Sequence, residues 1–198
     1  MMELTGINSS VLPALAGAIL IVILISIWII YRRRAGRSID SRLRRVSYDL
    51  LKQFIIPDGD EGEIHVEYAL LTGRGVIVLD IEHVEGIVFA SDSMEDWTVM
   101  ADRRRFTFAN PQHGLFDRMA AVKRLLPDIP VTGFVVFTNK AKFSKGQPSN
   151  VIMFNRLIDE LLTEIGDHHE EEMEAYQLQW DRLRDEAVAA QVGHLLRT

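Results

Sequence analysis

The strongest constraint on the fold is a predicted β-hairpin between residues 65 and 82. Two runs of alternating side chains flank Gly73-Arg74-Gly75. Glycine adopts positive φ angles without steric cost, so these three residues predict the turn. Apolar side chains occupy both faces of each strand, which is typical of strands buried in the middle of a sheet. The hairpin is therefore predicted to be central, with a sheet built around it.

Three carboxylates lie on this hairpin: Glu67 on its first strand, and Asp80 and Glu82 on its second. Side chains alternate along a strand, so Asp80 and Glu82 point to the same face. If Gly73-Arg74 is the loop, Glu67 lies opposite Asp80. If Arg74-Gly75 is the loop, Glu67 lies opposite Glu82. Either register brings three negative charges to one face.

Like charges that face each other across strands destabilise a sheet. A fold keeps such a group only if the carboxylates are well solvated, protonated or share a cation. A divalent metal site is therefore one interpretation of the hairpin. The other is an exposed hairpin end, because acidic side chains are mostly found in contact with water.

A membrane anchor is predicted at the N-terminus. Residues 11–30 contain no ionisable side chain, and twenty helical residues span roughly 30 Å, the thickness of the hydrocarbon layer. Three consecutive arginines begin at Arg32, which predicts a single-pass inner-membrane (plasma-membrane) protein with its N-terminus outside and its main domain in the cytoplasm. The predicted parts are an extracytoplasmic N-terminus (1–10), a helix in the lipid bilayer (11–31) and a basic linker (32–37).

The charge balance argues against a broad phosphate-binding surface. Residues 46–198 contain 15 basic and 26 acidic side chains, a formal charge near −11, whereas such surfaces are normally basic. Residues 32–45 form the main basic patch, for which contact with anionic lipid is the favoured interpretation. The chain contains no cysteine, which excludes thiol catalysis and cysteine-ligated zinc.

The remaining elements follow from periodicity and from helix-start signals. Asn110-Pro111 predicts a helix start, with asparagine as the cap and proline in the first turn. The whole pattern predicts an α+β (α/β-like) fold with helices on both faces of a mixed sheet, divided into a main domain (38–165) and a C-terminal amphipathic helix (166–198). The predicted elements are helices over 38–52, 110–126, 151–165 and 167–198, further strands over 86–90, 97–100, 106–108 and 131–138, and a loop over 140–149.

The last helix has an apolar stripe that allows two arrangements. Met173, Tyr176, Trp180 and Leu183 follow a three-four spacing. The stripe either packs on the main domain or forms a coiled coil with another copy or a protein partner. A capping box is predicted at its start, from Asp167 to Glu170.

The order of elements and several local motifs resemble the nuclease-related domain (NERD) family, a relative of the restriction-endonuclease-like PD-(D/E)XK fold. The resemblance covers residues 36–162. It rests on Val66-Glu67, Gly75, Asp80-Ile81-Glu82, Gly86, Trp97, Asn110-Pro111 and the strand 131–137.

The resemblance implies a catalytic and metal site formed by Glu67, Asp80 and Glu82. Active members of the superfamily use two acidic residues to hold Mg²⁺, which activates a water nucleophile. This chain departs from the pattern in two ways: Glu82 stands in the place of a lysine, and Gly114 in the place of a glutamine. The acids at positions 67 and 80 also exchange lengths relative to the pattern, a change that can cost about a hundredfold in rate.

Two functions remain open from the sequence. The favoured one is a catalytically degenerate, membrane-anchored module that interacts with proteins or associates with nucleic acid, without a metal. The alternative is an active Mg²⁺-dependent endonuclease or phosphodiesterase that cleaves DNA or RNA. In that case Glu67, Asp80 and Glu82 hold the metal, and Lys140 or Lys142 contacts phosphate.

Overall fold

The computed structural model describes residues 39–59, 62–165 and 170–197, together with residues 19, 21–23 and 25. The chain divides into two compact units, residues 1–42 and 43–198, and the fold described below is that of the second unit. The transmembrane helix predicted over 11–31 lies outside the described residues, except for the last five named, which are helical and exposed. No helix within the described residues is long and apolar enough to cross a bilayer.

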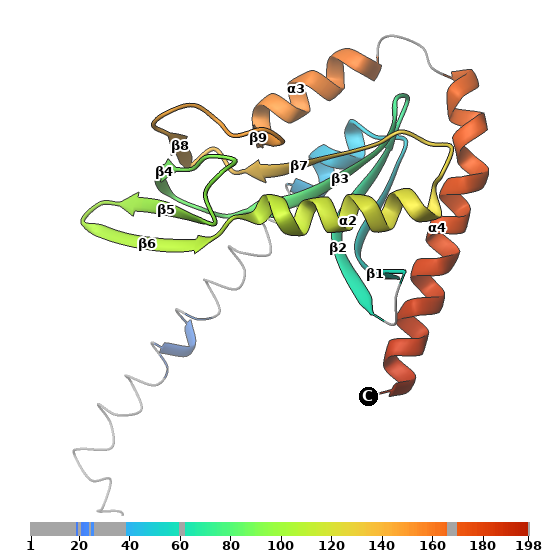
Figure 1. Ribbon diagram of the computed structural model, residues 1–198, viewed down its shortest axis with the longest axis horizontal. Helices are drawn as coiled ribbons and strands as arrows, with labels where there is room; N and C mark the ends of the chain where they lie inside the picture. The colour runs from blue at the N-terminus through green and yellow to red at the C-terminus, as the bar shows by residue number, and fades with distance from the viewer. Residues whose placement is uncertain are drawn as a thin grey trace, which may run out of the picture. The chain divides into compact units, whose positions relative to one another are not determined.

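The described part of the second unit contains two sheets and three long helices (Figure 1). The larger sheet has the strand order β1-β2-β3-β7-β9, and the smaller has the order β6-β5-β4-β8. The strands are β1 (Asp49–Pro57), β2 (Glu63–Thr72), β3 (Gly75–Glu82), β4 (Gly86–Phe89), β5 (Asp96–Ala101), β6 (Arg104–Ala109), β7 (Val131–Phe137), β8 (Ala141–Phe143) and β9 (Val151–Met153). The helices are α2 (Pro111–Leu125), α3 (Phe154–Ile165) and α4 (Glu170–Arg197).

The predicted hairpin is formed by β2 and β3, which lie in the interior of the larger sheet. β2 pairs antiparallel with β1 and β3, whereas β3 pairs parallel with β7, and β7 with β9. The sheet is therefore mixed, as the α+β prediction requires. Gly75 has a φ of +118°, and a side chain there would collide with the carbonyl oxygen of Pro130, so both conformation and space require glycine at this turn.

Helix α2 packs against β3 and β7 and covers the face of the sheet that carries the three carboxylates. Asn110 caps the helix, its side chain accepting a hydrogen bond from the backbone N–H of Gln112, as predicted. The helix approaches β7 closely at Gly133, where a β-carbon would lie 2.6 Å from the sulfur of Met119. Leu115 is fully buried in the same core as Val78 and Val135 of the sheet.

Three segments differ from the prediction. The helix predicted over 38–52 ends at residue 45, and β1 begins at Asp49. Val46 and Leu50 fit a helical spacing, but Leu50, Phe54 and Ile56 are buried as alternating residues of a strand. The predicted loop 140–149 contains β8, and residues 151–153, predicted as helix, form β9 beside β7. These three short runs pair with distant strands, which local periodicity does not reveal.

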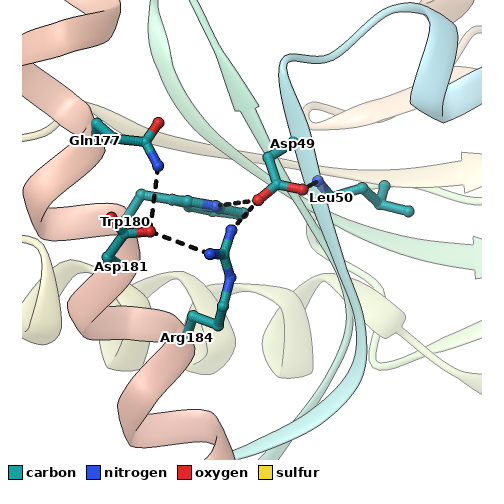
Figure 2. Close-up of polar contacts among 6 residues, drawn as sticks. All are labelled: Asp49, Leu50, Gln177, Trp180, Asp181 and Arg184. Atoms are coloured by element: carbon teal, nitrogen blue, oxygen red, sulfur yellow. Dashed lines mark hydrogen bonds and ion pairs between the residues drawn. The ribbon is translucent and has the colours of Figure 1, made fainter.

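Helix α4 packs on β1, so the domain-packing alternative for its apolar stripe is the one the structure supports (Figure 1). Trp180 and Leu183 are fully buried in the core that contains α2 and the sheet. Figure 2 shows that Asp49, at the start of β1, accepts a hydrogen bond from Nε1 of Trp180 at 2.9 Å. The same carboxylate forms an ion pair with Arg184. The predicted cap Asp167 and the side chain of Met173 lie outside the described residues.

Asp49 makes the docking of α4 dependent on pH. Partial burial raises the pKa of its carboxyl, but hydrogen bonds from Trp180 and the Leu50 amide, together with the charge of Arg184, outweigh this and lower the pKa below the ordinary 3.8. A carboxyl whose pKa is lowered in the folded state stabilises the fold at any pH above its unfolded-state pKa. This stabilisation is lost as the pH falls through the folded-state pKa. We expect Asp49→Asn to cost about 1 kcal/mol at pH 7, because the carboxylate is partly exposed and screened. Urea unfolding of both proteins should show this difference shrinking below pH 3.8. A difference that is independent of pH would contradict the assignment.

Candidate functional site

The turn of the β2–β3 hairpin decides which carboxylates face each other. Thr72 pairs with Gly75 and Tyr68 with Leu79, so Gly73-Arg74 is the two-residue loop. Continuing this register by one residue sets Glu67 opposite Asp80, the first of the two predicted alternatives. Asp80 and Glu82 lie beside Val135 and Phe137 of the parallel strand β7.

All three carboxylates line one open pocket with a volume of about 470 Å³. Strands β2 and β3 form one wall, and the beginning of α2 forms the other. The described residues around the pocket are Gln53, His65, Glu67, Asp80, Ile81, Glu82, Ala109, Asn110, Pro111, Gly114 and Arg118. The structure thus brings together the three residues that the sequence predicted for the site.

A cation of the chain itself enters this pocket. Arg118, from the middle of α2, places Nη1 3.1 Å from Oδ2 of Asp80. Its Nε donates a hydrogen bond to the backbone carbonyl of His65, at 2.8 Å. The guanidinium is therefore held by two different strands, with the Arg118 side chain 30% exposed and the Asp80 side chain 13% exposed.

The glycine one turn earlier in α2 leaves room for this arginine. A β-carbon at Gly114 would lie 2.6 Å from Nη1 of Arg118, closer than a side chain allows. Residues four apart lie on the same face of a helix, so any side chain at position 114 competes with Arg118 for space. Gly114 and Arg118 therefore act together: the missing side chain of one makes the position of the other possible.

Glu67 is also engaged by the protein. Its Oε2 accepts a hydrogen bond from the backbone N–H of Ile81, at 2.7 Å. Gln53, on the neighbouring strand β1, also lines the pocket and has a φ of +48°. Such a conformation is uncommon for a residue with a side chain. It interrupts the β1–β2 pairing opposite Glu67, between the Lys52–Tyr68 and Phe54–Val66 pairs.

The pKa of each carboxyl in the site is raised. Burial is the main cause for Glu67, Asp80 and Glu82 alike. The charge of Asp80 raises the pKa of Glu67 and of Glu82 further, and the charge of Glu67 raises that of Glu82. The charge of Arg118 opposes the shift in all three groups. Arg118 thus serves as a shared counter-charge for the cluster.

A divalent ion would require several oxygen ligands that converge on one point. Among the residues that the structure describes, no group of three or more His, Asp or Glu side chains is placed to hold a metal. Ligands of Mg²⁺ converge to about 2.0–2.1 Å from the ion. Here one carboxylate is paired with Arg118 and another is bonded to a backbone amide. A divalent ion at Asp80 would therefore have to compete with the Arg118 guanidinium.

Comparison with known protein families identifies the family to which this chain belongs. The family model described as "Nuclease-related domain" (NERD) matches residues 31–138, more than half of the chain. The chain belongs to the NERD family. No curated protein matches it significantly, and no solved structure does so.

Within the NERD domain, both departures from the family pattern occur at the pocket. Glu82 stands where the resemblance places the lysine, so the second strand adds a negative charge instead of a positive one. Gly114 stands where the resemblance places a glutamine, and Arg118 occupies the adjacent space. In this chain the guanidinium at the pocket comes from α2, and β3 contributes two carboxylates.

Other predicted residues lie away from the pocket. Lys140 forms a surface ion pair with Glu85 at 2.9 Å, and Lys142 is exposed on β8. Neither of the two lysines lines the carboxylate pocket. A phosphate contact of these lysines, as the nuclease alternative predicts, would therefore lie outside the carboxylate pocket.

The sequence did not reveal the role of Gln112. Its side chain is buried, and Nε2 donates to Oδ1 of Asp92 at 2.7 Å and to the carbonyl of Ser149 at 2.6 Å. Asp92 also accepts hydrogen bonds from the amide and hydroxyl of Ser149. This polar clamp, formed by Asp92, Gln112 and Ser149, fixes the first turn of α2 against two loops and thereby positions one wall of the pocket.

Proposed function

We propose that this chain is a membrane-anchored NERD module that does not cleave nucleic acid, and that it serves in interaction with proteins or in association with DNA or RNA. The observation that carries the proposal is the guanidinium of Arg118, which lies against Asp80 where the carboxylates would otherwise need a metal. A fixed arginine neutralises carboxylates, but it does not lower the pKa of a bound water as Mg²⁺ does.

The proposal includes the predicted location of the protein. Residues 11–31 anchor it in the inner membrane as a single span, with the N-terminus outside and the NERD domain in the cytoplasm. The supporting observations are the uncharged run of residues 11–30 and the arginines that follow it.

A second candidate keeps the nuclease activity. Glu67, Asp80 and Glu82 line a pocket that is open to solvent, and the Arg118 side chain is partly exposed. A rotation of this side chain would free Asp80 for Mg²⁺, and the three carboxylates would then supply oxygen ligands of the type that Mg²⁺ prefers. This candidate requires metal binding to compete with Arg118.

Cleavage assays distinguish the two candidates. The full chain in detergent is incubated with single- and double-stranded DNA and with RNA, each with Mg²⁺ or Mn²⁺. For a non-cleaving module we expect no cleavage above that of Glu82→Ala. Glu85→Ala is the matched control, since Glu85 is an exposed neighbour outside the pocket. Cleavage that requires metal, disappears in Glu82→Ala and persists in Glu85→Ala would establish the nuclease instead.

A further inference from the structure

The β5–β6 hairpin carries an exposed cluster of arginines. Its turn is formed by Asp102 and Arg103, and Arg104 and Arg105 begin β6. All three arginines are exposed, and among the described residues none of them forms an ion pair. In Figure 1 the hairpin projects from the rest of the second unit, at the left of the view. The tip is thus positive although residues 46–198 have a formal charge near −11.

Apolar side chains accompany these charges on one face of the smaller sheet. The strand pairing aligns Lys142, Ile87, Met100 and Arg105 in one row across β8, β4, β5 and β6. Directly paired residues share a face, so two apolar side chains lie between two basic ones. Ile87 is 44% exposed and Met100 39% exposed.

Glycine fixes the position of this row. Gly86 has a φ of +127°, and a β-carbon there would collide with the carbonyl oxygen of Met100. Strand β4 can therefore approach β5 closely only because residue 86 has no side chain. Phe106, which follows Arg105, is 44% exposed on the other face of the hairpin, so both sides of the tip combine arginine with an apolar group.

This combination indicates which anionic partner fits. Nucleic-acid phosphates would pair with the arginines but leave Ile87 and Met100 in water. A membrane interface accepts both groups, since cationic heads remain among the lipid phosphates while apolar side chains enter the acyl boundary. Guanidinium groups also match the geometry of phosphate oxygens.

We propose that the basic and apolar face of the smaller sheet, formed by Ile87, Met100, Arg105 and Lys142, docks on anionic phospholipid headgroups together with the adjoining hairpin tip, which carries Arg103 and Arg104. The proposal rests on the proposed membrane anchor in one respect: the anchor would keep this face close to the bilayer. Each basic side chain near an anionic leaflet contributes about fivefold in binding. Reversing the charge of the three arginines is therefore expected to weaken docking by at least about a hundredfold.

The absence of cysteine allows a direct test. A cysteine at Thr107, exposed on the same face two residues from Arg105, is labelled with a fluorophore in the full chain. The protein is reconstituted in nanodiscs of phosphatidylcholine, with or without phosphatidylserine, that contain nitroxide-labelled lipid. We expect quenching that depends on phosphatidylserine, and no such quenching for a label at Leu178, which is 75% exposed on α4.

The decisive variant carries Arg103→Glu, Arg104→Glu and Arg105→Glu, which should abolish the quenching. The matched control reverses Arg124, Arg156 and Arg182, which are exposed on the helices. Quenching that is equal in neutral discs, or that survives the reversal of the hairpin arginines, overturns the proposal. Arginine-dependent DNA binding without lipid quenching also overturns it.

Failure of the anchor gives a different result. The chain would then not be incorporated into either kind of disc. Flotation of the same full chain with phosphatidylserine vesicles, with and without the reversal of the hairpin arginines, would in that case test the docking face by itself. Flotation that the reversal abolishes supports the docking face, and flotation that it leaves unchanged, or no flotation at all, overturns it.

Discussion

Arg118→Ala should destabilise the domain and at the same time make it responsive to Mg²⁺. Removing one partner of a buried ion pair costs about 3–5 kcal/mol, and the partial exposure of Arg118 reduces this to about 2 kcal/mol. The loss arises because Glu67, Asp80 and Glu82 keep their charges in a half-buried pocket without a counter-charge. The deficit should therefore shrink at acidic pH, where these carboxyl groups, with their raised pKa values, become protonated.

Mg²⁺ should restore stability to the variant and leave the wild type unchanged. A ligand that binds only the native state stabilises it by about 2.7 kcal/mol at a hundred times its dissociation constant. Thermal unfolding with and without Mg²⁺ measures the effect. Arg124→Ala, at an exposed position two turns along the same helix, is the control and should change stability by less than about 0.5 kcal/mol.

Gly114→Ala provides an independent route to the same state. The added methyl group would displace the Arg118 guanidinium, and the gain in helix propensity, about 1 kcal/mol, would offset part of the loss. We expect this variant to respond to Mg²⁺ as well. A wild-type melting temperature that rises clearly with Mg²⁺ would show that Arg118 does not replace the metal.

Trp180→Ala should have the largest effect on stability. Replacing a buried aromatic side chain by alanine costs about 3–5 kcal/mol, and Trp180 is fully buried between α4 and the rest of the core. The change also removes the indole N–H that donates a hydrogen bond to Asp49. Domains are typically stable by only about 5–15 kcal/mol, so a loss of this size should markedly lower the melting temperature and populate unfolded protein at physiological temperature.

The exposed face of the same helix offers the control. Leu178, two residues earlier, is 75% exposed, and Leu178→Ala should change the free energy of unfolding by less than about 0.5 kcal/mol. Circular dichroism during urea unfolding measures both variants. If Trp180→Ala were as mild as Leu178→Ala, α4 would not be part of the folded core.

The central hairpin could be predicted because its signals are local. Gly75 determines the turn, and the alternation on both sides of it determines the faces of Asp80 and Glu82. The first four residues of β1 are predicted as the end of a helix because Val46 and Leu50 are compatible with either period. Only the pairing with β2, which depends on residues about 20 positions away, resolves this ambiguity.

The role of Arg118 could not be predicted for a similar reason. Gly114 was recognised as a departure from the family pattern, but its consequence lies one helical turn away and involves Asp80 on a distant strand. An arginine four residues after a glycine at the start of a helix is a weak signal by itself. It becomes informative only once α2 is known to pack across the strands that carry the carboxylates.

The polar clamp at the first turn of α2 has a consequence for motion. Gln112 ties this turn to Asp92 and Ser149, and Leu126, just past the other end of the helix, is fully buried. The helix backbone is therefore held at both ends, and Arg118 can leave the pocket only by rotating its own side chain. Partly exposed side chains change rotamer within picoseconds to nanoseconds, whereas helix movements take microseconds or longer. Release of Asp80 from Arg118 should therefore require no slow movement of the helix.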